Sequence, residues 1–178
     1  AFTIGSITTG GRYVGGIAGV LTTGATVSQS KAFMHVSGRQ QRLSVGIGSF
    51  NGTTVDQLTT SGNITIEEAA TATNLGGVIG GSYNNAVEVT NVQFTGNIIV
   101  NSITTTPSNI GGVIGYFVGA KLESATSNAI LNFPSYNHIG GLVGHSFSPN
   151  PSFLNLTHNR NVTGNANVGG IVGGTTDA

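Results

Sequence analysis

The sequence predicts an all-β protein that folds as a single-stranded parallel β-solenoid, a right-handed β-helix of about six coils with three strands in each coil. Three observations lead to this fold class. One short glycine-rich block recurs along the whole chain, its copies are about 30 residues apart, and the glycine-rich composition suits strands and turns better than helices. The repeats leave no stretch for a second domain, so residues 1–178 are expected to form one domain.

The recurring block consists of an apolar residue, Gly-Gly, two apolar residues and a final Gly. Its copies lie at residues 14–19, 43–48, 75–80, 110–115, 139–144 and 168–173. Counted on the second glycine of the pair, the steps between copies are 29, 32, 35, 29 and 29 residues, a period typical of stacked structural units. The copy at 43–48 is degenerate, because Ser44-Val45 stands where the others have Gly-Gly. We expect the geometry of the second coil to differ locally.

Three strand-sized pieces fill the period between blocks. A turn-like segment such as Asn51-Gly52 follows the block, then an alternating run such as 86–90, then a second run such as 96–100 that Gly-Asn opens. Three strands of about five residues with three turns account for this length. A β-propeller blade needs roughly 40–45 residues, which is too long. A parallel solenoid needs only one strand per face in each coil, with equivalent residues stacked at ~4.8 Å.

Small residues near the bends support the solenoid. Asn74, Asn109 and Asn167 each lie two residues before a Gly-Gly pair and are expected to stack as a ladder of side chains. We expect the paired glycines to be structural, with backbone angles at the bend that other residues avoid. They are Gly15, Gly16, Gly76, Gly77, Gly111, Gly112, Gly140, Gly141, Gly169 and Gly170.

Composition excludes several classes of function. Six basic and six acidic residues give a net charge of zero, so no field attracts nucleic acid. The absence of cysteine removes disulfides, thiolate catalysis and cysteine-ligated zinc. No apolar stretch approaches the roughly 18–20 residues of a membrane span. The first residues lack the basic start and apolar core of a targeting peptide, which predicts that any such peptide has been removed.

Repeats of Gly-Gly-aliphatic-aliphatic-Gly, each followed by an Asn/Thr-rich strand pair, resemble the GLUG repeats of large bacterial and protist surface proteins. Those proteins include filamentous-haemagglutinin-like adhesins and the non-catalytic parts of IgA-protease-like proteins. The resemblance covers residues 14–173. It implies a secreted or cell-surface location and no active site. In a glycosylating secretory pathway the chain would be a glycoprotein, with acceptor sequons at Asn51, Asn63, Asn155 and Asn161.

The acidic residues argue against catalysis. They are Asp56, Glu67, Glu68, Glu88, Glu123 and Asp177. A polysaccharide-degrading enzyme would need two or three acids close together on one face. Only Glu67 and Glu68 adjoin, and neighbours on a strand point to opposite sides. We therefore predict no catalytic residue, no cofactor and no enzymatic activity, with such an enzyme as a remote alternative.

The four histidines are His35, His138, His145 and His158. His138 and His145 flank the fifth block, but seven residues of strand span ~23 Å, a separation too large for one metal ion. The sequence thus predicts no metal site. His138 takes the ladder position that asparagine holds in other coils.

Aromatic residues follow several blocks by one to three positions, at Phe50, Tyr83, Tyr116 and Phe147. Stacked coil on coil, they would form a column along one edge. Such a column favours a carbohydrate-binding module as the alternative function, with glycans as partners. Core packing or turn covering is its more common use.

The leading hypothesis is a non-catalytic, extracellular structural or adhesive solenoid, either a segment of a surface protein or a self-stacking fibre subunit. Neither end has the polar residues of a capping coil, so the expected partners are further copies stacked end to end or further repeats of a longer chain.

A lateral contact is also expected. The two residues after Gly-Gly are both apolar, and adjacent strand residues point to opposite faces, so one of each pair should point outward. The resulting contact face is Ile79, Ile114, Val143 and Val172. The alternative is a local bulge that turns both residues inward.

Overall fold

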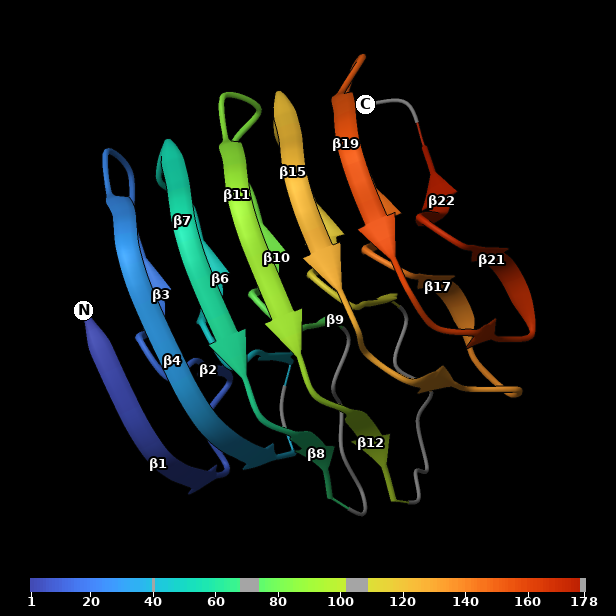
Figure 1. Ribbon diagram of the computed structural model, residues 1–178, viewed down its shortest axis with the longest axis horizontal. Coiled ribbons are helices and arrows are strands. Elements are labelled where there is room, and N and C mark those ends of the chain that lie inside the picture. The colour runs from blue at the N-terminus through green and yellow to red at the C-terminus, as the bar shows by residue number, and fades with distance from the viewer. Residues whose placement is uncertain (40, 68–73, 102–108, 177–178) are drawn as a thin grey trace.

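The computed structural model describes residues 1–39, 41–67, 74–101 and 109–176. These residues form strands and turns, with no helix among them. The strands stack in parallel, coil upon coil, and the two termini lie at opposite ends of the stack (Figure 1). The chain is therefore a β-solenoid of about six coils, which confirms the parallel β-solenoid that the repeats predict.

Each coil contributes one long strand to a parallel sheet, which we call the long sheet. Burial alternates along these strands: in β11, Val89 and Phe94 are fully buried while Gln93 between them is exposed. One face thus lines the core and the other faces solvent. The long strands are β1 (Phe2–Thr9), β4 (Thr26–Gly38), β7 (Thr54–Ser61), β11 (Glu88–Thr95), β15 (Lys121–Ser127) and β19 (Ser152–His158).

Two further sheets lie on either side of the Gly-Gly bend. The pre-bend sheet contains β2 (Tyr13–Val14), β5 (Arg42–Leu43), β9 (Asn74–Gly76), β13 (Asn109–Gly111), β17 (Asn137–Gly140) and β21 (Ala166–Gly169). The post-bend sheet contains β3 (Ala18–Leu21), β6 (Ile47–Phe50), β10 (Ile79–Ser82), β14 (Ile114–Phe117), β18 (Val143–Ser146) and β22 (Val172–Thr175). Both sheets have six strands in chain order, so each coil adds one strand to each sheet.

Four short strands complete the coils after the long sheet. They are β8 (Ile64–Ile66), β12 (Ile98–Val100), β16 (Leu131–Asn132) and β20 (Val162–Thr163). β8 pairs with β4 and β12, whereas β16 pairs with β20. Between these two groups a single bridge joins Asn97 to Ile130. The ladder of the solenoid therefore splits between β12 and β16.

The Gly-Gly bend brings two backbones into direct contact. A Cβ atom added to Gly76 would lie 2.0 Å from the carbonyl oxygen of Ile79, and one added to Gly77 would lie 2.0 Å from Cγ of Phe94. Both distances are well inside the roughly 3.5–4.0 Å of normal carbon contacts. The first glycine is therefore required by the neighbouring backbone, and the second by a side chain from the long sheet.

The expected reason for these glycines, unusual backbone angles, is wrong. The described glycines with positive φ are Gly5, Gly24, Gly62 and Gly96, none of which belongs to a block. The lack of space for a side chain is what the bend imposes.

Successive bends are also bonded to one another. The backbone N–H of Val78 donates to the carbonyl of Val113 at 2.9 Å, and the N–H of Val113 donates to the carbonyl of Leu142 at 2.9 Å. The N–H of Leu142 continues the series to Ile171, also at 2.9 Å. The turn at each corner is thereby tied to the next coil, as the strands are.

The two apolar residues after Gly-Gly point into the core together. Val78 and Ile79 are both 0% exposed, and the same holds for Val113, Ile114, Leu142 and Val143. The expected outward contact face of Ile79, Ile114 and Val143 is therefore wrong, and Val172 of the last coil is half-buried in the same column. The alternation of a strand does not apply because β10 begins only at Ile79, so Val78 lies in the bend itself.

The degenerate second coil keeps the common register. β5 pairs with both β2 and β9 although Ser44-Val45 replaces Gly-Gly. Val45 is fully buried, and Thr60 occupies the register position that Phe94 holds in the next coil, so the smaller side chain leaves room. Gly46 makes the close approach instead, since its Cβ would lie 2.4 Å from the Val78 carbonyl oxygen.

Every long strand from β4 to β19 contains one residue with positive φ. These residues stack as a row and are Gln29, Gln57, Asn91, Ser124 and Asn155, with φ between 47° and 54°. Amide and hydroxyl side chains tolerate this conformation better than branched ones. The row interrupts the pairing once in each strand and thereby bends the long sheet.

The core is closed in the middle coils and open in the last. Val168 is 41% exposed, whereas Ile139, its partner in the preceding coil, is 0% exposed. Phe153, Leu156 and Val162 are also half-buried, although their register partners Leu122, Ala125 and Leu131 are all 0% exposed. The inner columns of the last coil thus lack the covering coil that each earlier coil has.

Replacement of Gly77 with Val should lower the free energy of unfolding by about 3 kcal/mol, because the new side chain collides with Phe94. Gly170 is the matched control: it holds the same position in the last coil, and no atom lies within 4 Å of a Cβ added there. Urea denaturation of Gly77→Val and Gly170→Val should separate the two variants. Equal stabilities would refute the packing explanation.

Candidate functional site

Polar and aromatic side chains meet where the chain doubles back at each bend. Nη1 of Arg42 donates a hydrogen bond to Oγ of Ser49 at 2.9 Å, and Nδ2 of Asn74 donates to the hydroxyl of Tyr83 at 2.8 Å. Each bond joins a pre-bend strand to the segment that follows the same bend. These side chains are half-buried or buried.

One continuous stack, which we call the aromatic row, runs along the solenoid axis. Its members are Tyr13, Arg42, Tyr83, Tyr116 and His145. The Arg42 guanidinium lies 4.7 Å from the Tyr13 ring centroid and 3.9 Å from that of Tyr83. The Tyr83 and Tyr116 centroids are 5.5 Å apart, and those of Tyr116 and His145 are 5.9 Å apart with an angle of 8° between the planes. Cation–π and stacking contacts of this kind stabilise exposed and half-buried rings.

The environment of the row shifts the pKa of its phenols. Burial raises the pKa of Tyr83 to about 12, although the charge of Arg42 opposes that rise. Burial also raises the pKa of Tyr116. Both hydroxyls are therefore neutral at physiological pH, and neither is suited to act as a base.

The aromatic column predicted from the sequence is confirmed in part. Tyr83 and Tyr116 stack as expected, but Phe50 is fully buried in the core and Phe147 is 37% exposed outside the row. The sequence reasoning missed Arg42 and Tyr13, which come from the pre-bend strands. Alignment of residues just before each block would have placed them near the column.

The predicted asparagine ladder forms in two coils. Nδ2 of Asn109 donates to Oδ1 of Asn74 at 2.7 Å. By the register of β13 and β17, His138 follows Asn109 and interrupts the ladder, as the sequence predicts. Asn167 lies beyond it on an exposed strand.

The expected separation of His138 and His145 is wrong. Their ring centroids lie only 4.6 Å apart, at an angle of 69°. The estimate of ~23 Å assumed a continuous extended strand. The chain instead doubles back at Gly140-Gly141, so β17 and β18 bring the two rings together.

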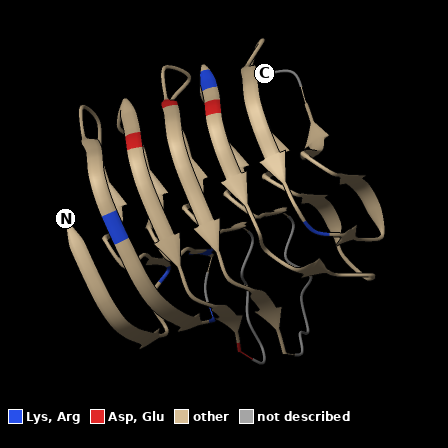
Figure 2. Cartoon of the chain, in the orientation of Figure 1, with Lys and Arg blue, Asp and Glu red and all other residues tan. Residues whose placement is uncertain are grey.

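Three of the described acidic residues, Asp56, Glu88 and Glu123, lie near the start of the adjacent long strands β7, β11 and β15 (Figure 2). Asp56 accepts hydrogen bonds from Thr90 at 2.7 Å and from Asn91 at 2.8 Å, and these hold the pKa of the Asp56 carboxyl below its ordinary value. Lys121 lies 3.3 Å from both Glu88 and Glu123. Glu67 accepts from Ser37, while Glu68 and Asp177 lie outside the described residues. Within the described ranges, no group of three or more His, Asp or Glu side chains could hold a metal.

The four sequon asparagines differ in their exposure to solvent. Asn51, Asn155 and Asn161 are exposed. Asn63 is half-buried, and its Oδ1 accepts a hydrogen bond from the backbone N–H of Asn97 at 3.2 Å.

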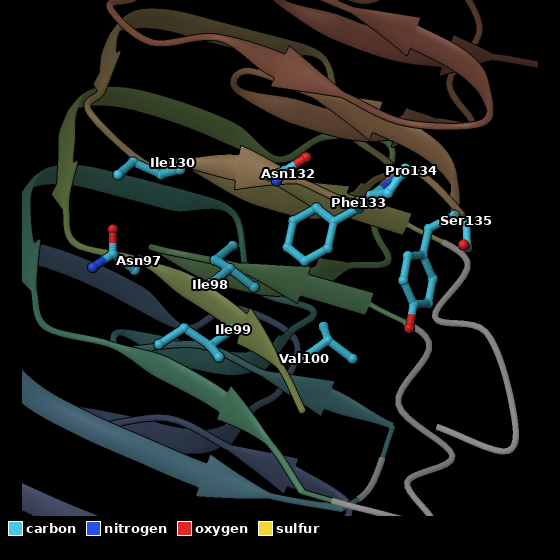
Figure 3. A pocket seen from close by; sticks show the side chains of 10 residues that line it. Asn97, Ile98, Ile99, Val100, Ile130, Asn132, Phe133, Pro134 and Ser135 are labelled. Atoms are coloured by element: carbon cyan, nitrogen blue, oxygen red, sulfur yellow. The ribbon is translucent and has the colours of Figure 1, made fainter. Parts of the chain in front are cut away.

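A cavity of about 520 Å³ opens where the ladder splits between β12 and β16 (Figure 3). Ile98, Ile99, Phe133 and Tyr136 are among the side chains that line it, and no charged residue does. The Phe133 and Tyr136 rings pack edge to face with centroids 5.8 Å apart. The cavity offers hydrophobic contact but no group for acid–base chemistry.

No protein-family model, curated protein or solved structure matches this chain. Among the described residues, no helix is long and apolar enough to span a membrane.

Replacement of Arg42 with Met should lower the free energy of unfolding by about 1 kcal/mol, because two cation–π contacts and the bond to Ser49 are lost. Arg160→Met removes an exposed guanidinium and serves as the control, with an expected change within about 0.5 kcal/mol. Thermal unfolding of both variants measures the difference. If Arg42→Met were as stable as the unaltered chain, the free-energy cost of removing the guanidinium from water would cancel the gain from its contacts.

Mild acid should destabilise the fold through two histidines. Burial lowers the pKa of His145 and of His158 from the ordinary value of 6.5, so the unfolded chain binds more protons there than the folded one. The stability that these two histidines contribute is complete above about pH 6.5. It is lost as the pH falls through their lower pKa values in the folded chain. Melting temperatures measured from about pH 7.5 to pH 5 should fall.

His158→Phe should make that fall smaller. Phenylalanine is already present at the same register position in β11, where Phe94 packs on Gly77 as His158 packs on Gly141. The same pH dependence in His158→Phe and the unaltered chain would contradict the assignment to His158.

Proposed function

We propose that this chain is a non-catalytic structural and interaction module of a secreted or cell-surface protein, in which solenoid coils stack on its terminal coil. The further coil belongs either to a second copy, in a self-stacking fibre, or to further repeats of a longer chain. The observation that carries the proposal is the open core of the last coil: Val168 is 41% exposed where Ile139 is 0% exposed. A coil in the same register would bury this column and pair the free edges of β19 and β22.

The regular register supports an architectural role. All six coils keep the same pairing in the pre-bend and post-bend sheets, including the degenerate second coil. A hydrolytic site of the glycosidase kind needs a carboxyl group with a raised pKa as its general acid, whereas hydrogen bonds lower the pKa of Asp56, and Glu88 and Glu123 pair with Lys121. The secreted or cell-surface location rests on the resemblance to GLUG repeats, which is also the basis for an adhesive role.

Carbohydrate binding through the aromatic row is disfavoured by its geometry. A sugar ring needs a free aromatic face, but the faces of Tyr83 are occupied by Arg42 and Tyr116. Tyr116 is likewise held between Tyr83 and His145. A glycan array that compares the unaltered chain with Tyr116→Ala tests this alternative. We expect that replacement of Tyr116 removes no glycan binding, because the row does not bind sugars.

Sedimentation at increasing protein concentration tests end-to-end stacking. Val168→Lys places a charge on the open inner column and should prevent association. Leu154→Lys is the matched control, because Leu154 is 48% exposed in the same coil but pairs with outward-facing Glu123. Association that both variants lose equally would argue against stacking through the core.

If the chain stays monomeric at every concentration, the self-stacking fibre is excluded and only the form with further repeats in a longer chain is left. A copy of residues 148–176, appended after residue 176, tests that second form. If the extra coil covers the open column, the melting temperature should rise. No rise would overturn the proposal in both forms.

A further inference from the structure

The cavity between β12 and β16 lies where the length of the repeat changes. Counted on the second glycine of each block, the coil that contains β12 takes 35 residues and the coil that contains β16 takes 29. Among the described residues, the two strands are joined only at the bridge between Asn97 and Ile130; beyond it β12 pairs with β8 and β16 pairs with β20. A long coil next to a short one thus leaves a space in the wall of the solenoid.

Apolar side chains from both coils line this space. Ile98 of β12 and Phe133, just after β16, are each 4% exposed, and Val100 lies half-buried beside them (Figure 3). Ile99 and Ile130 also line the cavity and are 38% and 54% exposed, so they form its mouth. An apolar space offers a water molecule few hydrogen bonds and favours an apolar occupant.

Backbone hydrogen bonds hold the aromatic side of the cavity in place. The N–H of Phe133 donates to the carbonyl of Thr163 at 2.9 Å, and the N–H of Tyr136 donates to the carbonyl of Phe133 at 3.0 Å. The N–H of Asn165 donates in turn to the carbonyl of Tyr136 at 2.7 Å. The turn that carries both rings is therefore fastened to the next coil, and a ligand meets a site that is already formed.

Size and charge limit what can bind. The volume of about 520 Å³ falls within the roughly 300–1,000 Å³ of small-molecule sites. None of the ten described residues that line the cavity is charged. Burial raises the pKa of Tyr136, so its hydroxyl is neutral at physiological pH. A charged ligand would lose its hydration here without gaining a partner, and the cavity therefore favours an uncharged one.

The paired rings favour an aromatic ligand. Phe133 and Tyr136 pack edge to face with an angle of 89° between their planes, and a further ring packs favourably against an edge or a face of such a pair. An extended peptide is less suitable. The bridge between Asn97 and Ile130 holds β12 and β16 together at one end, whereas a strand inserted between them would need the two edges apart along their whole length.

We propose that this cavity is a binding site for one small, uncharged aromatic molecule of a few rings. The molecule lies between β12 and the turn that carries Phe133 and Tyr136, and it covers Ile99 and Ile130 at the mouth. The site lies between the third and fourth coils, away from the open core of the last coil. It is therefore independent of the stacking proposed above.

Fluorescence titration with N-phenylnaphthylamine, an uncharged probe that brightens in apolar surroundings, tests the site. We expect saturable binding of one probe per chain. The sulfonated analogue, anilinonaphthalenesulfonate, has the same rings and a negative charge, so it should bind about tenfold more weakly. Absence of saturable binding overturns the site, and a sulfonate that binds as tightly as the uncharged probe, or more tightly, overturns the proposed class of ligand.

Two variants in the cavity and one outside it locate the probe. Ile130→Lys removes apolar area at the exposed mouth, whereas Val100→Phe adds apolar area but fills the interior. Each should weaken binding about tenfold, and circular dichroism checks that each is folded. Val168→Lys is the control: it places the same charge on the open core of the last coil and should leave the affinity unchanged. A folded Ile130→Lys or Val100→Phe that binds as tightly as the unaltered chain overturns the site, as does loss of binding in Val168→Lys.

Discussion

Contact between backbones at the Gly-Gly bend is the constraint on which the rest of the structure depends. Strands before and after the bend approach so closely that the neighbouring carbonyl occupies the place of a side chain at Gly76. This approach turns both following aliphatic residues into the core and ties each bend to the next through backbone hydrogen bonds.

The same close approach creates the surface at which side chains meet. Residues before a block and after it come from opposite sides of the bend, and they touch because the glycines of the bend have no side chains to hold the two strands apart. Arg42 reaches Ser49, and His138 reaches His145, over the glycines of their own coils. The aromatic row and the histidine pair are thus products of the bend and need no separate scaffold.

Repetition made the fold predictable, and local geometry limited the prediction of the site. The spacing of the blocks and the positions of Asn74 and Asn109 were enough to place strands and part of the ladder. With the bend taken as extended strand, the sequence pattern places the two histidines far apart and Ile79 outward, and the structure contradicts both predictions. Positive φ at residues such as Gln57 and Ser124 could not be predicted either, because neither residue type signals it as glycine does.

The termini lie at opposite ends of the stack, and backbone hydrogen bonds between coils run along the same axis (Figure 1). Tension applied through the two ends would therefore load every interface between coils in series. Because each coil contacts only its neighbours, these interfaces would give way one at a time. Mechanical extension would then proceed in steps of one coil, each releasing about 29 residues of chain.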